Sequence, residues 1–194
     1  MPSSPAKIIF LDRDGVINAE SAAYVKSVAE FDPLPGSIAA IARLTRAGWR
    51  IFVATNQSSV ARKMITLERL TQIHQHLNDL VEAAGGRIEQ IFFCPHGPDD
   101  ACDCRKPNPG LLLNAQQQYG LDLANSIMIG DSLRDLQVAD NAGCGAKIVV
   151  RTGYGEETLQ ELPAAGVTVD YVADDLADAV TWLLATYPIG LIDG

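Results

Sequence analysis

Two aspartates, Asp12 and Asp14, lie two positions apart in the stretch LDRDG, directly after a short apolar run. At the end of a strand, one carboxylate of such a pair can attack a phosphorus atom and form an aspartyl-phosphate. The other is then close enough to protonate the leaving oxygen and afterwards to accept a proton from water. The same Asp-x-Asp-Gly stretch is also typical of a plain turn, so other residues must decide between the two interpretations.

Three cysteines and a histidine gather in the eleven residues CPHGPDDACDC. Cys94, His96, Cys102 and Cys104 are the kinds of ligand that Zn²⁺ prefers, and four protein ligands complete its tetrahedral shell. A catalytic zinc keeps one position open for water, so the ligand count predicts a structural zinc. A disulfide is the weaker alternative, because a bridge between Cys102 and Cys104 would strain so short a ring.

The remaining cysteine and two further histidines lack a ligand spacing of this kind. Cys144 stands alone in NAGCGA and is expected to be a small buried residue beside a helix end. His74 and His76 fall on the helical pattern of residues 66–84, where we expect surface or partly buried side chains with no metal role.

The composition limits the class of protein. The chain has 194 residues, 47% hydrophobic and 20% charged, which predicts one globular domain with a substantial core. A net charge of -9 disfavours a nucleic-acid or anionic-membrane surface, although one cationic pocket could still bind an anion. The start MPSSPAKIIFLD lacks the regions of a signal peptide, and no apolar run approaches the roughly 20 residues of a membrane span. We therefore expect a cytoplasmic protein without a nucleic-acid or membrane partner.

Short apolar runs alternate with helical patterns along the chain. The lack of polar alternation within these runs is typical of parallel strands that are buried on both faces. The runs span residues 8–12, 50–56, 88–94, 126–131, 146–152 and, more weakly, 169–174. Helical patterns bounded by capping residues or glycines span residues 36–47, 66–84, 109–119, 133–142 and 174–186. The alternation predicts an α/β fold, a doubly wound, Rossmann-like parallel sheet with helices on both faces.

Polar residues follow the first four predicted strands, at the end of the sheet where ligands bind in this architecture. Asp12 and Asp14 follow the first strand. The second strand leads to Thr55, Asn56, Gln57 and Ser58. The third leads to the cysteine cluster, which is followed by Arg105 and Lys106. The fourth leads to Asp131 and Ser132. Carboxylates, a hydroxyl and a lysine therefore converge on one edge, which predicts a cation-assisted phosphate site and disfavours a plain turn at LDRDG.

The carboxylates at this edge match the ligands of a hard cation. Asp131, in MIGDSLRD, would complete an oxygen site with Asp12 and a main-chain carbonyl near Asp14. Mg²⁺ prefers such ligands, keeps several waters and bridges to a substrate phosphate. Asp131 also fits the N-cap of the following helix, and both roles can hold together. Asp135 is either a residue of the metal shell or an orienting carboxylate.

Thr55 and Lys106 are candidates for phosphate binding because of their places in this series. Thr55 offers a hydroxyl and a run of backbone N–H groups, and Lys106 a positive charge for the phosphoryl oxygens of the transition state. Either residue alone would be interpreted as a capping residue or a solvated surface charge.

Together LDRDG, VATNQS, the lysine of CRKP and IGDSLRD resemble, in order, the four motifs of the haloacid-dehalogenase-like (HAD) phosphohydrolase superfamily. The resemblance implies that Asp12 is the nucleophile and Asp14 the acid/base, and that Mg²⁺ lies among Asp12, Asp14 and Asp131. It also implies that Thr55 and Lys106 stabilise the transferred phosphoryl group.

The motifs cover residues 8–152 and, with the zinc loop, resemble a narrower subgroup that contains heptose-bisphosphate and histidinol-phosphate phosphatases. In this subgroup Arg105 would help to recognise the substrate. Some heptose enzymes carry a lysine directly after the last motif aspartate, where this chain has Ser132. The other predicted substrate contacts are Glu20 and Tyr24 in the segment ESAAY, together with Asn56, Gln57, Ser58 and Ser132.

Many HAD phosphatases insert a cap domain after the first motif or between the second and third. The segment from Asp14 to the second strand holds mostly one loop and one helix, and the segment from Thr55 to Cys94 holds one helix and one strand. Neither has room for a folded cap. We therefore expect a single domain over residues 1–194, a monomer, whose open mouth is shaped by the zinc loop 94–104.

The leading hypothesis is an Mg²⁺-dependent phosphoric monoester hydrolase that acts on a phosphorylated sugar. Its reaction would remove the C7 phosphate of a heptose 1,7-bisphosphate on the route to nucleotide-activated heptose and lipopolysaccharide core precursors. Arg105 beside Lys106 indicates a second anionic group, which favours this substrate over the close alternative, cationic histidinol phosphate. A non-catalytic phosphate-ligand binding protein is the remote alternative, disfavoured because both motif aspartates are present.

Overall fold

Within residues 7–187, which a computed structural model describes, six strands form one parallel sheet. The part of the single-domain prediction that concerns residues 1–6 and 188–194 lies outside the described residues. The order in the sheet is β3-β2-β1-β4-β5-β6, with β1 (Ile8–Leu11), β2 (Arg50–Asn56), β3 (Gln90–Cys94), β4 (Ser126–Gly130), β5 (Ala146–Val150) and β6 (Tyr171–Ala173). Each predicted strand is present, so the doubly wound α/β fold is confirmed.

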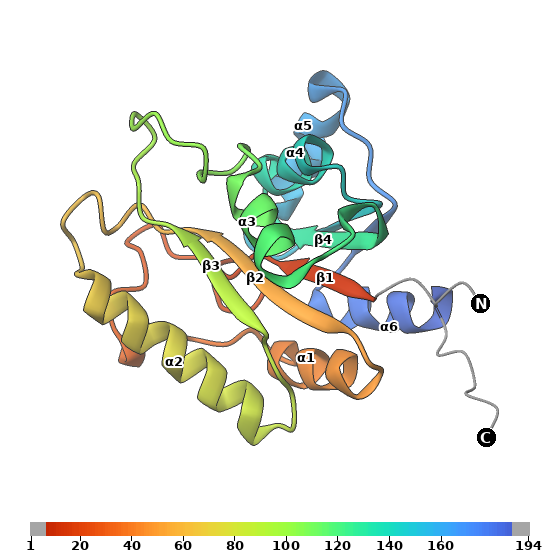
Figure 1. Cartoon of the computed structure of the whole chain (residues 1–194), viewed down its shortest axis with the longest axis horizontal. Helices are drawn as coiled ribbons and strands as arrows, with labels where there is room; N and C mark the ends of the chain where they lie inside the picture. Colours follow the sequence, from red (N-terminus) through yellow and green to blue (C-terminus); the bar gives the residue numbers. More distant parts are fainter. Residues whose placement is uncertain (1–6, 188–194) are drawn as a thin grey trace.

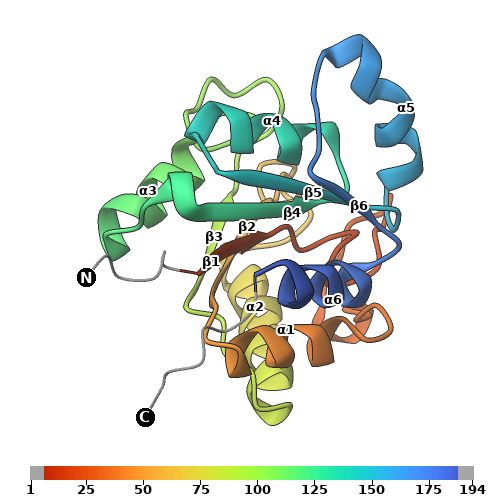
Figure 2. The ribbon, with the colours of Figure 1, turned by 90° about the vertical axis from the view of Figure 1, so that its right-hand side faces the viewer.

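Helices cover both faces of the sheet (Figures 1 and 2). One face carries α1 (Ser37–Arg46), α2 (Leu67–Ala83) and α6 (Leu176–Thr186). The other carries α3 (Gly110–Tyr119), α4 (Leu133–Ala142) and α5 (Gly155–Ala165). Two short 3-10 helices, η1 (Val28–Glu30) and η2 (Leu123–Asn125), lie in the connections.

The central strand β1 shows why its sequence IIFL is apolar throughout. Successive side chains of a strand point to opposite faces of the sheet, and here both faces are covered. Ile9 and Leu11 pack into the core beneath α1, α2 and α6, while Ile8 and Phe10 pack into the core beneath α3 and α4. All four residues are fully buried. The two cores hold β1 rigidly, and with it the loop that begins at Asp12.

Helix α5 was not among the predicted helices. Its sequence GEETLQELPAA has a proline in the last turn and few apolar residues, both of which weaken a helical pattern. Leu162 nevertheless packs against Leu136 of α4 and Val149 of β5. The tertiary contact thus stabilises a helix that its own sequence specifies weakly.

The strand order creates a crevice beside β1. The chain proceeds outward from β1 to β2 and β3, and then returns to the other side of β1 as β4. Ligands bind at such a reversal in open α/β sheets. Leu11 pairs with Ile129, and the Asp12 N–H donates to the Ile129 carbonyl at 3.0 Å. The loops after β1 and β4, which carry Asp12 and Asp131, therefore begin side by side.

The described residues 7–187 contain no separate cap domain. The connection from β1 to β2 holds η1 and α1, and the connection from β2 to β3 holds α2. Among the helices in this part of the chain, none is both long and apolar enough to cross a membrane.

Candidate active site

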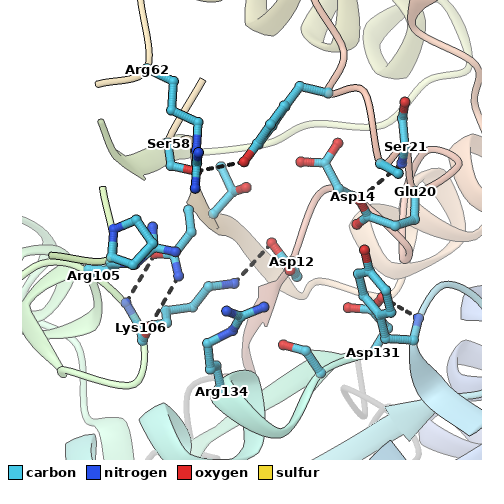
Figure 3. A pocket seen from close by; sticks show the side chains of 17 residues that line it. Asp12, Asp14, Glu20, Ser21, Ser58, Arg62, Arg105, Lys106, Asp131 and Arg134 are labelled. Atoms are coloured by element: carbon cyan, nitrogen blue, oxygen red, sulfur yellow. Dashed lines mark hydrogen bonds and ion pairs between the residues drawn. The ribbon is translucent and has the colours of Figure 1, made fainter. Parts of the chain in front are cut away.

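A cavity of about 280 Å³ opens at the carboxyl ends of the central strands (Figure 3). Every residue predicted for catalysis, substrate binding or Mg²⁺ lines it except one, Gln57. The lining residues from these predictions are Asp12, Asp14, Glu20, Tyr24, Thr55, Asn56, Ser58, Arg105, Lys106, Asp131 and Ser132. Residues from four strand ends thus come together in one place.

Lys106 lies at the base of this cavity and is 2% exposed. Its Nζ contacts Oδ1 of Asp12 at 2.9 Å and Oδ1 of Asp135 at 2.5 Å, and donates to the Ala54 carbonyl at 2.7 Å. Burial alone would lower the pKa of Lys106, but the carboxylates of Asp12 and Asp135 raise it above its ordinary value. The amine is therefore held as a cation whose position is fixed by three oxygen atoms.

Asp12, Asp131 and Asp135 bring carboxylate oxygens within 4.8 Å of one another. Burial, followed by the carboxylates of Asp135 and Asp12, raises the pKa of Asp131 to about 9. Burial also raises the pKa of Asp12 to about 7, against the opposing effect of Lys106. Crowded, buried carboxylates repel one another unless a cation lies among them. The donor set is made of hard oxygen atoms and fits Mg²⁺.

Asp135 differs from the other two carboxylates because its oxygens are already engaged. Oδ1 contacts Lys106, and Oδ2 accepts hydrogen bonds from the Ser132 backbone N–H at 3.0 Å and the Ser132 hydroxyl at 2.7 Å. Asp135 is fully buried at the start of α4. Of the two roles considered for it, these contacts favour the orienting one.

Asp14 lies near Asp12, but its carboxylate faces a different set of groups. Arg13 binds it through Nε and Nη2, Asn18 Nδ2 donates to Oδ1 at 2.9 Å, and Gln57 Nε2 donates to Oδ2 at 2.8 Å. Burial alone would raise the pKa of Asp14, but Arg13 and these hydrogen bonds hold it below its ordinary value. The Asp14 side chain is outside the carboxylate cluster, so only its main-chain carbonyl remains as the predicted Mg²⁺ ligand.

Two of the side chains predicted to bind substrate also have hydrogen-bond partners within the protein. Gln57 is 3% exposed and connects Asp14 to Thr55, whose Oγ1 accepts from Gln57 Nε2 at 2.9 Å. Asn56 pairs with the backbone of Lys106, since it donates to the carbonyl at 3.1 Å and accepts from the N–H at 3.0 Å. Both contacts position residues of the cavity, so we assign Gln57 and Asn56 a supporting place in the site.

The end of the loop after β5 and the first turn of α5 hold Asp131 through contacts that were not predicted. The Tyr154 N–H donates to Oδ2 of Asp131 at 2.9 Å, and the Thr158 hydroxyl donates to its carbonyl at 2.8 Å. A Cβ atom on either Gly15 or Gly153 would lie 2.0 Å from the same Oδ2, and both glycines have positive φ. Gly15 and Gly153 thus leave space for the Asp131 carboxylate, which the Tyr154 N–H orients.

Three arginines line the side of the cavity that carries Lys106 (Figure 3). Arg105 is one of the predicted contacts, whereas Arg62 and Arg134 were not predicted. The signal for them was present in the motifs, because Arg62 ends TNQSSVAR and Arg134 stands within GDSLRD. Acidic side chains gather on the facing side, where Glu20 has its pKa raised by burial and by Asp14.

Tyr24 and Ser58 line another part of the cavity wall. The Ser58 hydroxyl donates to the Tyr24 hydroxyl at 3.4 Å, and Tyr24 adopts a left-handed backbone with φ 60°. Few residues other than glycine adopt this conformation without support from their surroundings. The arrangement places the Tyr24 ring at the cavity, where its hydroxyl can meet a polar ligand.

The cysteine cluster forms a compact group of ligand atoms beside the cavity. Sγ atoms of Cys94, Cys102 and Cys104 lie 3.0 to 3.7 Å apart, and Nδ1 of His96 lies 3.3 Å from Cys104 and 3.6 Å from Cys94. A tetrahedron of Zn–S bonds has edges of about 3.8 Å, so the four atoms surround a centre of suitable size. All the cysteines are free.

This cluster is hydrogen-bonded to the side of the cavity that carries Arg105 and Lys106. Arg105 follows the last cysteine and donates from Nη1 to the His96 carbonyl at 3.1 Å. Asn108 donates to the Cys102 carbonyl at 2.8 Å. The loop therefore fixes the backbone from which Arg105 and Lys106 enter the cavity.

The sheet topology and this set of strand-end residues define the class of protein as a phosphohydrolase with the HAD-like fold. The HAD-hydrolase-like family matches residues 103–179. A D-glycero-β-D-manno-heptose-1,7-bisphosphate 7-phosphatase of Bordetella bronchiseptica is 48% identical over 92% of this chain and 98% of its own. The enzyme of that name from Pseudomonas aeruginosa is 46% identical over 91% of this chain and 97% of its own.

A solved structure is also similar to this chain over most of its length. The crystal structure of the D,D-heptose 1,7-bisphosphate phosphatase of B. bronchiseptica, complexed with magnesium and phosphate, is 47% identical with a TM-score of 0.87. It matches 93% of this chain and 99% of that protein. The chain belongs to the family of D-glycero-D-manno-heptose-1,7-bisphosphate 7-phosphatases, and the resemblance expected from its motifs is confirmed.

Proposed function

We propose that the protein is an Mg²⁺-dependent phosphatase that removes the C7 phosphate of D-glycero-β-D-manno-heptose 1,7-bisphosphate. The observation that carries the proposal is the contact of buried Lys106 with Asp12, beside Asp131, in a cavity walled by three arginines. The names of the relatives support the substrate and its β anomer. The product would serve the synthesis of nucleotide-activated heptose.

The roles of the residues follow from their contacts. Asp12 attacks the phosphorus atom and the bond to the C7 oxygen breaks. Asp14 gives that oxygen a proton once the anionic substrate phosphate beside it has raised its pKa from the lowered value set by Arg13. Asp14 then takes a proton from water, which cleaves the aspartyl-phosphate and restores Asp12. Lys106 and Thr55 hold the phosphoryl oxygens. Mg²⁺, held by Asp12, Asp131 and the Asp14 carbonyl, would neutralise charge between the carboxylate and the phosphate.

The arginines support a substrate with a second phosphate. Guanidinium groups bind phosphate through paired N–H donors, and Arg62, Arg105 and Arg134 all line the cavity. The phosphate at C7 would lie in the cavity against Asp12 and Lys106, which leaves the arginines for the phosphate at C1. On the side of the cavity that carries these arginines, the cationic amine of histidinol phosphate would be repelled.

A substrate panel tests this proposal. Phosphate release is measured for both anomers of the heptose bisphosphate, for the heptose 7-monophosphate and for histidinol phosphate. We expect the β-bisphosphate to give the highest kcat/KM and histidinol phosphate the lowest. Rapid release from histidinol phosphate with none from either bisphosphate would contradict the proposal.

Replacing Arg134 by glutamine is expected to raise KM for the bisphosphate by about 10- to 100-fold, because a charge-assisted hydrogen bond is worth about 1.5–3 kcal/mol. The KM for the 7-monophosphate, which lacks the C1 phosphate, should change little. Arg87→Gln is the matched control, since Arg87 is exposed and lies outside the cavity. Equal increases for both substrates would show that Arg134 does not recognise the C1 phosphate.

We also propose that the zinc is structural, since four protein ligands leave no open position. Cys104→Ser should lose the bound zinc, lower Tm by more than about 5 °C and raise KM through the displaced Arg105. The measurements are elemental analysis, thermal unfolding and kinetics. Cys144→Ser is the matched control, because Cys144 is free and lies outside the cluster. Active, stable wild-type protein without zinc would contradict the assignment.

We propose a single domain over residues 1–194 that acts as a monomer in the cytoplasm. Free cysteines support a reducing compartment, in which a thiolate cluster can hold zinc. The net charge of -9 supports a small-molecule substrate over nucleic acid.

A further inference from the structure

Arg13 lies between the two motif aspartates, yet it does not line the cavity. It is 1% exposed and is among the largest fully buried side chains of the described residues. A buried guanidinium is unfavourable unless its charge and its N–H groups are satisfied. The partners of Arg13 therefore indicate what it does.

The first partner is Asp14. Nη2 of Arg13 lies 2.8 Å from Oδ1 and 3.0 Å from Oδ2, and Nε lies 3.2 Å from Oδ1. Contacts of a planar guanidinium with both oxygens restrict the rotation of a carboxylate as well as its distance. Asn18 and Gln57 add single hydrogen bonds, which restrict the carboxylate less.

The second partner is His74, which reaches Arg13 from the middle of α2. Nη1 of Arg13 lies 3.3 Å from Nε2 of His74. Since a guanidinium can only donate, Nε2 must accept, and the histidine is neutral with its proton on Nδ1. The ring is 7% exposed and lies 5.5 Å from the ring of Phe93. Burial, and then the charge of Arg13, lowers the pKa of His74 to about 3, which agrees with a permanently neutral acceptor.

We propose that Arg13 and His74 are positioning residues for Asp14: His74 orients the guanidinium, and the guanidinium holds the carboxylate at the leaving-group oxygen. The inference rests on the acid/base role proposed for Asp14. Helix α2 does not line the cavity, but it would influence the reaction through the contact of His74 with Arg13. A residue placed about 1 Å from its productive position can cost about 100-fold in rate.

The alternative is that the buried pair only stabilises the fold. A general acid matters most when the leaving group is an alkoxide and little when it is nitrophenolate, which leaves without a proton. Loss of positioning should therefore reduce kcat/KM for the sugar bisphosphate and spare p-nitrophenyl phosphate. Loss of folding or of phosphate binding would reduce both alike. The parameter kcat/KM reports the first phosphoryl transfer, before water attacks the aspartyl-phosphate.

Both substrates are measured with His74→Leu, which removes the acceptor, and His74→Gln, which keeps an oxygen acceptor on a side chain of similar length. His76→Leu is the matched control, because it makes the same change on the same helix and does not contact Arg13. Asp14→Asn sets the size of the effect when the acid itself is lost. Thermal unfolding is followed for every variant.

We expect His74→Leu to lower kcat/KM about 10- to 100-fold for the bisphosphate and less than about threefold for p-nitrophenyl phosphate. His74→Gln should recover most of the loss, and His76→Leu should resemble wild type. If Asp14→Asn is selective for the bisphosphate but His74→Leu is not, the inference is overturned and the proposed function stands. If Asp14→Asn itself spares the bisphosphate, the acid/base assignment fails and the inference with it.

Discussion

Replacing Asp12 by asparagine is expected to reduce phosphate release by more than about 10⁴-fold, since removal of a covalent nucleophile causes losses of this size. The amide has nearly the shape of the carboxylate but cannot attack phosphorus. Its oxygen can still accept a hydrogen bond from Lys106, which lies 2.9 Å from Oδ1 of Asp12. The cavity should therefore keep its form while the chemistry stops.

Three measurements check this result. Steady-state kinetics gives the loss of kcat, rapid quenching of the wild type should trap a phosphorylated protein that Asp12→Asn lacks, and thermal unfolding should show a folded variant. Asp99→Asn in the exposed part of the zinc loop is the matched control and should leave activity unchanged. Activity of Asp12→Asn within tenfold of wild type would exclude Asp12 as the nucleophile.

Replacing Lys106 by methionine is expected to have the second largest effect, because the residue acts on both activity and stability. The substitution removes the cation between Asp12 and Asp135, which would leave buried carboxylates without a partner. Breaking a buried ion pair in this way costs about 3–5 kcal/mol of unfolding free energy. Loss of a charge that stabilises the phosphoryl oxygens should lower kcat about 10²- to 10³-fold.

Urea unfolding and phosphate release measure the two effects separately. Arg87→Met is the control, because Arg87 pairs with Glu89 on the surface and such pairs contribute about 0–1 kcal/mol. Lys106→Arg should also lose activity, since the larger planar group cannot reproduce the three contacts of Nζ. A Lys106→Met variant as stable as wild type would mean that the ion pairs with Asp12 and Asp135 do not support the fold.

The sequence alone determined the type of sheet and the set of strand-end residues. Continuous apolar runs indicate parallel strands covered on both faces, and the ends of parallel strands meet at one edge. Asp12, Thr55, Lys106 and Asp131 could therefore be grouped without coordinates. The zinc ligands could be predicted for a simpler reason, because they lie within a few residues of one another.

Only the tertiary structure decided which side chains face the cavity and which support it. Gln57 has the same polar character as its neighbours, but it turns inward to join Asp14 and Thr55. Whether a polar side chain faces a ligand or a protein partner depends on packing around it, which local spacing does not encode.

The contacts that hold Asp14 (through Arg13) and Asp131 in place join residues that are far apart in the chain. His74 lies 61 residues from Arg13, and Tyr154 lies 23 residues from Asp131. His74 was expected at the surface or partly buried, but α2 packs on the sheet and buries it. A sequence pattern reports the local period of an element, whereas the partner of a buried polar group is chosen by the packing of whole elements. The sequence therefore determined which residues could do chemistry, and the tertiary structure determined how they are held.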